Sequence, residues 1–424
     1  MGLKIAVVGG ASTYTPELVD GFAAHQDRLP IDELVLLDIN RERLEVVAGL
    51  AGRILKKRGW PGKLALTDRR DQAIEGANFV VIQLRVGGQQ ARMLDETLPL
   101  EFGCIGQETT GPGGFAKALR TVPVVLEIAE EVGKRAARGA WIVDFTNPVG
   151  IVTQALLDDG HRAIGLCNSA MGFQRMLARL LEVPPADVSL EHVGLNHLTW
   201  ERSVRVWGED RLPGLLESHA DTIGGEIGIP AGLIRLLGAI PSYYLRYYYC
   251  TQEVLEEQQS GRRRSRADEV MEIERALLAL YADPGLDEKP ALLMQRGGAY
   301  YSEAAAQLIA SLHAGTGDHQ AVDVRNQGTL SMLPEDAVVE VPARIDREGA
   351  HPQPVASLPP EIAGLVQQVK AYELLTVGAA IHGDRDRALK ALMANPLVRT
   401  YSTARALRDA LLQANREHLP RFFR

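Results

Sequence analysis

The sequence predicts an α/β protein in which a domain built on a parallel β-sheet precedes an α+β domain. Short β-branched runs alternate with helix-length segments through the first third of the 424-residue chain. A glycine pair follows the first run, and after about residue 168 the alternation gives way to paired strands and long helices. Strands separated by helices form βαβ units, which build parallel sheets with right-handed crossovers.

The first part of the pattern is regular enough to place each element. Ligands collect at the carboxyl ends of parallel strands, so the glycine pair at 9–10, Asn147 and Cys167 should lie along one edge of the sheet. The expected strands are 4–9, 33–39, 78–88, 141–148 and 162–167, and the expected helices are 16–25, 41–59 and 115–137.

The rest of the chain has a different pattern of apolar and polar residues. Residues 189–208 show the partial alternation of apolar and polar residues that is typical of an antiparallel strand pair. We therefore expect one domain over residues 1–168 and an α+β domain over residues 169–424. The latter should contain helices at 266–282, 302–314, 360–381 and 386–397, and a strand at 337–346.

The composition indicates a globular protein with a large core. Apolar residues make up 46% of the chain and the net charge is −8, which argues against nucleic acid or an anionic membrane as partner. The three cysteines, Cys104, Cys167 and Cys250, cannot all pair, and this favours a reducing, cytoplasmic location. The N-terminal apolar run is too short for a signal peptide, and no segment approaches the length of a membrane span.

The segment GGASTYTPEL, residues 9–18, has the design of a dinucleotide-binding turn. Its glycines allow a tight turn, its hydroxyls can donate to an anion, and a helix N-terminus follows. An acid at the end of the second strand suits the adenosine ribose. Ala11 and Tyr14 depart from the GxGxxG pattern, so an ordinary strand–helix turn is the alternative; Ala11 is a small change only if its φ is negative. The candidate cofactor-binding residues are Gly9, Gly10, Ser12, Thr13 and Asp38.

Three polar residues in loops are further candidates. Arg92 and Glu108 lie in or beside glycine-rich segments that suit a cleft for a polar ligand, although single charged loop residues are usually solvated. Asn147 follows a strand and can bind a sugar hydroxyl or a cofactor ribose. The alternative is that Asn147 caps the helix that begins near Pro148.

Cys167 and His197 are thirty residues apart and do not define a metal site by themselves. A structural zinc site needs four ligands, and a lone cysteine is more often a small buried hydrophobe. An open catalytic site needs only two or three protein ligands, with substrate oxygens completing the shell. The five tyrosines within 240–249 form either an aromatic face of the core or a site where a nearby cation lowers the pKa of a phenol.

The order of these motifs resembles glycoside hydrolase family 4, and within it the 6-phospho-β-glucosidase-like branch. The likeness covers nearly the whole chain. It is carried by VGGASTYTPEL, QLRVGGQQARMLDE, GQETTGPGG, DFTNPVGIVT, GLCN, GLNHLTW, IPSYYLRYY, RADEVMEIE, RGGAYYSEAA and LPEDAVVEVPARID. It implies that the first domain is a Rossmann-type NAD-binding domain like that of lactate and malate dehydrogenases, and that the second carries substrate, metal and subunit contacts.

The resemblance implies hydrolysis of a 6-phospho-β-glucoside with NAD and a divalent metal, usually manganese, rather than with paired carboxylates. Hydride leaves C3, a base takes the C2 proton, and the leaving group departs from C1 before water adds and the hydride returns. It also implies a small phosphorylated disaccharide or glycoside as substrate, and a homodimer or homotetramer.

Roles for single residues follow from the matching motifs. Cys167 and His197 match the metal ligands, and Tyr244 matches the base at C2. The other matches concern the substrate: Asn147, Asn168 and Asn196 for sugar hydroxyls, Arg92 and Arg266 for the 6-phosphate, and Glu108 as an acid near the metal site.

Other functions are compatible with parts of this pattern. A lactate- or malate-type 2-hydroxy acid dehydrogenase would share the first domain, and a silent NAD- or sugar-phosphate-binding protein would share both pockets. A family 4 glycosidase with another sugar specificity is a further alternative. The phospho-β branch usually has proline where this chain has Ala170, a departure that bears on the sugar and not on the metal.

Overall fold

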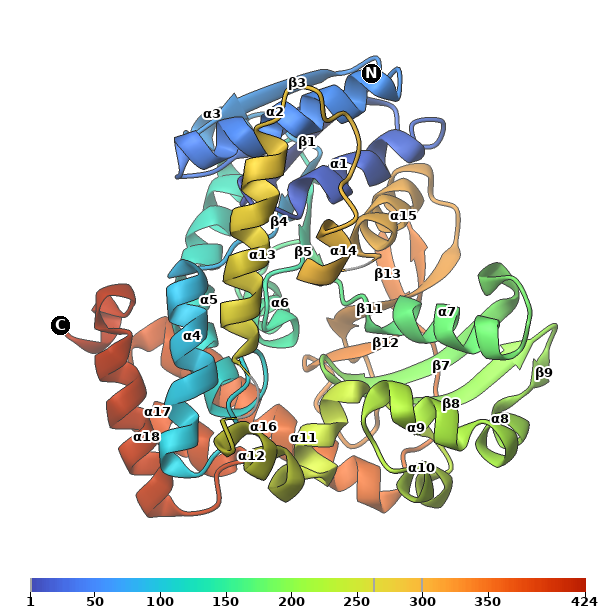
Figure 1. The fold of residues 1–424 in the computed structure, drawn as a ribbon, viewed down its shortest axis with the longest axis vertical. Helices are drawn as coiled ribbons and strands as arrows, with labels where there is room; N and C mark the ends of the chain where they lie inside the picture. Colours follow the sequence, from blue (N-terminus) through green and yellow to red (C-terminus); the bar gives the residue numbers. More distant parts are fainter. Residues whose placement is uncertain (1, 262–263, 299) are drawn as a thin grey trace.

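The computed structural model of the protein describes residues 2–261, 264–298 and 300–424. In these ranges, strands from both halves of the chain form one mixed sheet, in the order β10-β8-β7-β12-β11-β6-β5-β4-β1-β2-β3, with β13 paired to β12 and β9 paired to β8. Figure 1 shows the N-terminal strands at one end of the molecule and β7 and β8 at the other.

The N-terminal half confirms the predicted parallel sheet of the Rossmann type. Its strands lie in the order β3-β2-β1-β4-β5-β6 and are all parallel. β4 is buried along its whole length, as expected for a strand that helices cover on both faces. The strands are β1 (Leu3–Val8), β2 (Ile31–Leu37), β3 (Lys63–Thr67), β4 (Phe79–Ile82), β5 (Trp141–Asp144) and β6 (Ala163–Gly165).

Helices connect these strands and pack on the sheet. The N-terminal helices are α1 (Thr15–Ala24), α2 (Arg41–Lys57), α3 (Arg70–Ile74), α4 (Gly88–Thr97), α5 (Gly111–Arg135) and α6 (Val149–Asp158). The predicted strand 78–88 is too long, because the backbone leaves the sheet after Ile82 and turns at Gly87, whose φ is +79°, before α4 begins. β3 was not predicted; it lies at the sheet edge, where only Thr67 is fully buried.

The second half extends the same sheet with antiparallel strands. These are β7 (Val188–Leu195), β8 (Leu198–Val206), β9 (Glu209–Asp210), β10 (Ile240–Pro241), β11 (Asp318–Arg325), β12 (Val338–Asp346) and β13 (Gly349–Pro352). β11 pairs with β6 through Asp323 and Gly165, so hydrogen bonding is continuous between the two halves. The division into domains at residue 168 stays a prediction.

The helices of the second half pack on these strands and on the helices of the N-terminal half. They are α7 (Ser169–Leu180), α8 (Leu212–Ser218), α9 (Ala220–Ile227), α10 (Ala231–Leu237), α11 (Arg246–Tyr249), α12 (Thr251–Gln259), α13 (Arg266–Tyr281), α14 (Leu293–Arg296), α15 (Tyr301–Ala314), α16 (Pro360–His382), α17 (Arg385–Ala394) and α18 (Tyr401–Ala414). α13 is the connection that matters most for the site, because it contacts α4 and α2 and so runs from the centre of the molecule to the N-terminal sheet (Figure 1).

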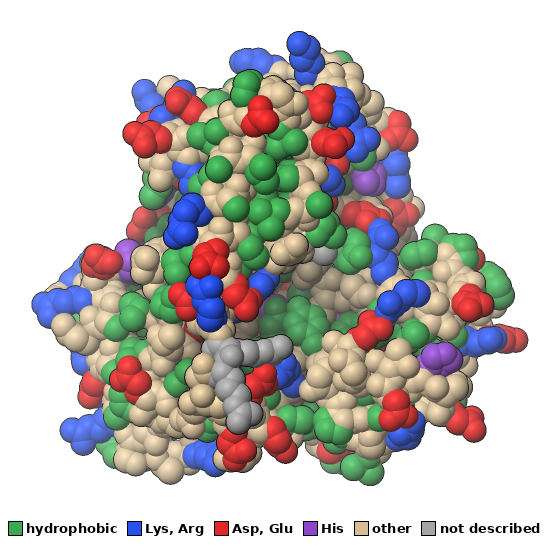
Figure 2. Space-filling view, viewed as in Figure 1, with side chains coloured by type: hydrophobic (Ala, Val, Ile, Leu, Met, Phe, Trp, Pro, Cys, Tyr) green, Lys and Arg blue, Asp and Glu red, His purple; other side chains and the backbone are tan. Residues whose placement is uncertain are grey.

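None of the helices in the described ranges is long and apolar enough to cross a membrane. The face drawn in Figure 2 is hollowed near its centre, with hydrophobic side chains at the bottom of the hollow and charged side chains of both signs around it.

Candidate active site

The turn between β1 and α1 is held tightly against the neighbouring strands. Gly9 has a φ of +91°, and a Cβ there would lie 2.6 Å from the carbonyl oxygen of Gln83, so only glycine fits. Gly9 and Gly10 both donate their N–H groups to the Leu37 carbonyl. Ala11 is not among the residues with positive φ, so it replaces glycine here without strain.

Asp38 lies beside this turn, as the sequence predicts. One of its carboxylate oxygens accepts a hydrogen bond from the Ala11 N–H at 3.0 Å, and the other accepts from the Asn40 N–H at 3.0 Å. Ile39, the next residue, is 91% exposed. The glycine turn, the acid and an exposed apolar side chain therefore share one edge of the sheet, where an adenosine could lie on Ile39 with its ribose near Asp38.

The two hydroxyls of the turn differ in their surroundings. Ser12 is partly exposed, and its Oγ accepts from the Tyr14 N–H at 3.2 Å. Thr13 is fully buried, and its Oγ1 lies 3.2 Å from a carboxylate oxygen of Glu274 and 2.6 Å from Nε of Arg296. Both hydroxyls lie at the turn as predicted, but the Thr13 hydroxyl is already engaged by residues from the second half of the chain.

Cys167 and the Asn196–His197 turn come from the ends of two different strands. Cys167 follows β6, and Asn196 and His197 form the two-residue turn between β7 and β8. Cys167 is buried, and burial, followed by the nearby carboxylates of Glu340 and Asp323, raises the pKa of its thiol well above the ordinary value, although a hydrogen bond from Asn196 opposes this. The sequence-predicted pair Cys167 and His197 therefore meets around Asn196.

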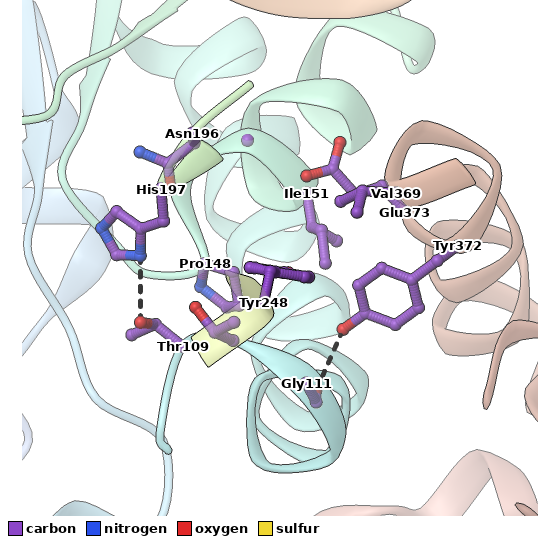
Figure 3. Close-up of a pocket in the computed structure, with 12 residues that line it drawn as sticks. Thr109, Gly111, Pro148, Ile151, Asn196, His197, Tyr248, Val369, Tyr372 and Glu373 are labelled. Atoms are coloured by element: carbon purple, nitrogen blue, oxygen red, sulfur yellow. Dashed lines mark hydrogen bonds between the residues drawn. The ribbon is translucent and has the colours of Figure 1, made fainter. Parts of the chain in front are cut away.

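The His197 side chain is a neutral imidazole with one nitrogen already hydrogen-bonded. Burial, followed by the charge of Lys117, lowers the pKa of His197 to about 3. Its Nδ1 lies 3.0 Å from the Thr109 hydroxyl, which donates its single proton to Gln107 Oε1 at 3.0 Å. When the Thr109 hydroxyl donates to Gln107, its oxygen accepts from Nδ1–H, and this tautomer leaves the lone pair of Nε2 available for a metal. Figure 3 shows His197 and Thr109 on one side of a small pocket that Tyr248, Tyr372 and Glu373 also line.

Backbone strain accompanies this arrangement. His197 has a φ of +62°, a left-handed conformation that is uncommon outside glycine and that collects at functional sites. Cys167 and His197 are two candidate ligands, and within the described ranges no group of three or more His, Cys, Asp or Glu side chains could hold a metal ion. The two residues thus fit an open site whose remaining ligands come from substrate or water.

Tyr244 stacks directly on the His197 ring. The ring centroids are 3.6 Å apart and the planes differ by 14°. Burial, followed by the neighbouring Tyr243, raises the pKa of Tyr244 well above its ordinary value. Tyr248 and Tyr249 pack against the core, as the first alternative predicts, and the role of Tyr244 as a base stays a prediction.

Glu108 is the centre of a buried ionic cluster. Its carboxylate pairs with Lys117 at 2.7 Å, with Arg92 at 3.4 Å and with Arg85. Burial opposes ionisation, but Arg85, Lys117 and Arg92 hold the pKa of Glu108 well below its ordinary value. Burial and the neighbouring Arg85 lower the pKa of Lys117 to about 7. Glu108 is therefore a paired, charged residue and not a solvated loop acid.

The two predicted phosphate arginines lie on adjoining helices. Arg92 on α4 is buried and donates to Glu96 at 2.7 Å. Arg266, at the start of α13, is partly exposed, pairs with Glu269 at 2.9 Å and donates to the Gln295 carbonyl. The second oxygen of Glu96 accepts from the Ala267 N–H at 2.8 Å, so Glu96 joins the two helices between the arginines. The neighbouring Arg262 and Arg263 lie outside the described residues.

The three predicted asparagines flank the site. Asn147 does not cap the next helix, because α6 has Pro148 as its N-cap and no side-chain cap bond. Its Oδ1 is buried without a hydrogen-bond partner among the described residues, as expected of an atom that awaits a ligand. Asn168 precedes α7 beside Cys167, and Asn196 donates to Glu340 at 2.9 Å.

Two family models cover almost the whole chain. The family 4 glycosyl hydrolase model matches residues 4–183, and the model of the family 4 glycosyl hydrolase C-terminal domain matches residues 192–398. The chain belongs to family 4 of the glycosyl hydrolases.

Relatives within family 4 match over their full length. A probable 6-phospho-beta-glucosidase of Bacillus subtilis is 42% identical over 100% of this chain and 98% of its own. The 6-phospho-beta glucosidase of Thermotoga maritima, solved with NAD and glucose-6-phosphate, superposes with a TM-score of 0.93 at 36% identity over 99% of both chains. Another structure of that protein, with manganese, NAD+ and glucose-6-phosphate, has a TM-score of 0.89 at 35% identity over 98% of both chains.

A dehydrogenase shares the fold alone. The malate dehydrogenase of Cryptosporidium parvum has a TM-score of 0.56 at 17% identity, over 90% of this chain and 99% of its own. This confirms the predicted likeness of the N-terminal half of the family 4 fold to the lactate and malate dehydrogenases.

Sequence reasoning missed a buried ionic group behind the site of this family 4 enzyme. His192 lies between two carboxylates, with Nδ1 2.6 Å from Glu201 and Nε2 2.7 Å from Glu340. Burial alone would lower the pKa of His192, but Glu201 and Glu340 raise it to about 10. Because Glu340 also accepts from Asn196, the group anchors the turn that carries His197. No local motif marks these residues, since they meet only through the pairing of β7, β8 and β12.

Proposed function

We propose that this family 4 enzyme hydrolyses 6-phospho-β-glucosides with NAD and a divalent metal, Mn²⁺ being the first candidate. The observation that carries this proposal is the stack of Tyr244 on His197, next to Asn196, which hydrogen-bonds to Cys167 after the end of β6. The full-length likeness to 6-phospho-beta-glucosidases supports the same substrate class.

Cys167 and His197 are the proposed metal ligands, and the turn of Gly9, Gly10 and Ser12 with Asp38 is the proposed dinucleotide site. When bound, NAD takes up the hydride of C3 and returns it, and the divalent metal polarises the oxygens on C2 and C3 so that the C2 proton becomes acidic. Thr109 keeps Nε2 of His197 directed outward, and burial keeps the His197 imidazole neutral.

Tyr244 is the proposed base that takes the C2 proton. Burial and Tyr243 raise the pKa of its phenol, so the phenol needs a nearby positive charge to act as a base near neutral pH. A divalent metal held by Cys167 and His197 would supply such a charge beside Tyr244, whose ring stacks on His197. The leaving group then departs from C1, and water adds there after the proton has gone.

The substrate is held from two sides in this proposal. Arg92 and Arg266, joined through Glu96, would bind the 6-phosphate. Asn147, Asn168 and Asn196 would bind the sugar hydroxyls, with the unpaired Oδ1 of Asn147 as one acceptor. Glu108 would hold the side chains of Lys117 and Arg92 in place through its ion pairs with them. It would not carry a proton, because the pKa of its carboxyl group is held low.

The proposal also covers the domains, the subunit assembly and the location of the enzyme. We propose two domains divided near residue 168, a homodimer or homotetramer, and a cytoplasmic location that suits the free thiol of Cys167.

The decisive test is release of nitrophenol from nitrophenyl 6-phospho-β-glucoside under reducing conditions. The reaction should need both NAD and Mn²⁺, should show no net NADH, and in heavy water should place deuterium at C2 of the released sugar phosphate. Net NADH would instead favour a dehydrogenase. Turnover that neither a chelator nor removal of NAD affects would exclude this mechanism.

Two additions make the test specific. Tyr244→Phe should abolish C2 exchange, whereas Tyr247→Phe should retain it, because Tyr247 belongs to the same cluster but faces Arg246, with the guanidinium 5.8 Å from its ring centroid. A panel of phosphorylated and free α- and β-glycosides with gluco and galacto configuration then defines the sugar. Equal rates on free glycosides would contradict the roles of Arg92 and Arg266.

A further inference from the structure

Arg296 reaches the glycine turn from the other half of the chain. It is the last residue of α14, and its Nε donates to Thr13 Oγ1 at 2.6 Å while an Nη donates to Ser12 Oγ at 3.4 Å. The same guanidinium pairs with Glu274 on α13 at 3.1 Å. Thus a cation that neither the glycine turn nor α1 supplies lies against both hydroxyls of the turn.

The charges around Glu274 do not balance. Glu274 also pairs with Arg43 at 3.1 Å and accepts from Gln89 at 3.2 Å. Within the described ranges, Glu274 is the one carboxylate paired with either arginine, so two guanidinium groups share one negative charge. The side chains of Arg296 and Glu274 are only 18% and 7% exposed, and that of Arg43 is 30% exposed. A net positive charge at a partly sheltered place favours a bound anion.

The backbone of the turn indicates where that anion lies. Gly9, Gly10 and Ala11 donate their N–H groups to Leu37 and Asp38, but the Thr13 N–H makes no hydrogen bond to any described residue. The N-terminus of the ten-residue α1 follows directly and lacks a side-chain cap. An unpaired N–H, an uncapped helix start and the Arg296 guanidinium therefore surround one position, which suits the oxygens of a diphosphate.

We propose that Arg296 binds the pyrophosphate of the dinucleotide and that Glu274 is the positioning residue that holds the Arg296 guanidinium over the turn. The proposal rests on the proposed location of NAD above Gly9 and Gly10. It makes α13 a common support, because Arg266 at its start serves the substrate phosphate and Glu274, about 12 Å further along the helix, serves the cofactor.

Calorimetric titration of the full-length protein with NAD, ADP-ribose and adenosine tests this assignment without any measurement of turnover. Arg296→Gln should weaken NAD and ADP-ribose by about 10- to 100-fold, the loss of one charge-assisted interaction, and leave adenosine unchanged. Arg296→Lys should recover part of the affinity. Glu274→Gln should weaken ADP-ribose relative to adenosine, although by less than Arg296→Gln.

Arg53→Gln is the matched control. Arg53 also joins α2 to the α13 region, donating to the Tyr281 and Leu286 carbonyls, but it makes no contact with the turn. The Arg53→Gln protein should bind NAD, ADP-ribose and adenosine with the same affinities as the unaltered protein. An equal loss for adenosine and ADP-ribose in Arg296→Gln, or a loss of glucose 6-phosphate affinity in place of ADP-ribose affinity, would overturn the assignment.

The assignment and the proposed cofactor site can fail separately. Asp38→Ala should weaken adenosine and NAD alike. If it changes neither affinity, the dinucleotide lies elsewhere and the proposed site is wrong. If Asp38→Ala acts as expected but Arg296→Gln binds ADP-ribose with unaltered affinity, the cofactor site stands and the role of Arg296 is excluded.

Discussion

At the scale of single residues, the proposed metal ligand His197 is hydrogen-bonded to a hydroxyl from another loop. Thr109 donates its proton to Gln107 and accepts from Nδ1–H, and this fixes both the tautomer and the direction of the ring. Partners of this kind typically change metal affinity by about 10- to 100-fold. We expect Thr109→Val to weaken Mn²⁺ binding by about that factor, measured by titration calorimetry on the metal-free protein.

Thr110→Val is the control for this change. Thr110 is the next residue, is buried and precedes α5, but its side chain makes no capping bond. Its loss should leave Mn²⁺ affinity within about twofold, given the small effect of removing an unused hydroxyl. Similar weakening in both variants would mean that packing in this loop, and not the hydrogen bond to His197, sets the affinity.

A separate prediction concerns His192 and the dependence of folding stability on pH. Its pKa is about 10 in the folded protein and about 6.5 in an unfolded chain. Below pH 6.5 both states bind the proton and the stabilisation is complete; between about 6.5 and 10 only the folded state binds it, so stability falls as pH rises. The loss should approach about 1.4 kcal/mol per pH unit. His192→Gln should remove this contribution from the slope of unfolding free energy against pH.

The quantity to measure is the difference in slope between the unaltered protein and His192→Gln. The slope of one protein alone is not enough, because Lys117 makes stability change with pH in the opposite direction. Its folded pKa of about 7 lies below its ordinary value, so its contribution to stability rises with pH over much of the same range. Urea unfolding at several pH values between 6.5 and 10 gives the slopes. His351→Gln, which removes a half-exposed histidine bonded to Asp346, should leave the slope unchanged, and so would His192→Gln if His192 were neutral.

At the scale of elements, the start of α13 joins helix stability to substrate binding. Ser265 caps this helix by accepting from the Asp268 N–H at 3.1 Å, and Arg266 is the first helical residue. Ser265→Ala should cost about 1 kcal/mol of unfolding free energy, the usual value of such a cap. It should also raise KM for the phosphorylated substrate more than it lowers kcat, because Arg266 becomes less well held.

Thr400 provides a matched comparison. It caps α18 through the Thr403 N–H at 3.1 Å, far along the chain from the proposed phosphate residues. Thr400→Ala should cost a similar amount of stability and leave KM unaltered. If both alanine variants raise KM equally, the effect of Ser265 is one of general stability and Arg266 has no special dependence on its cap.

The same scale shows what the sequence could predict. Buried strands such as β1 and long amphipathic helices such as α2 were predicted close to their observed bounds, because their residue patterns are local. β3 was missed, since an edge strand needs little burial. The metal pair and Tyr244 could be proposed because short motifs carry them. His192, Lys117 and Arg296 could not, because each acquires its partners only when distant elements pack together.

At the scale of the whole molecule, one buried ion pair joins three distant parts of the chain. Arg120 on α5 makes two hydrogen bonds to Asp95 on α4, with both side chains fully buried. The guanidinium also donates to Asn415 after α18 at 3.2 Å and to the Val86 carbonyl at 3.0 Å. The C-terminal helices are thereby attached to the loop that precedes the proposed phosphate residue Arg92.

Removing only the arginine should be far more costly than removing the pair. Arg120→Met leaves the Asp95 carboxylate buried without a partner and should destabilise the protein by about 3–5 kcal/mol. The double variant Asp95→Asn with Arg120→Met should recover much of that loss, because no charge is stranded. Lys134→Met, which breaks an exposed ion pair with Glu130 on the same helix α5, should cost less than about 1 kcal/mol. Denaturant unfolding gives all three values. Equal losses in the single and double variants would mean that the shape of Arg120, rather than its charge, holds the C-terminal helices to the N-terminal half.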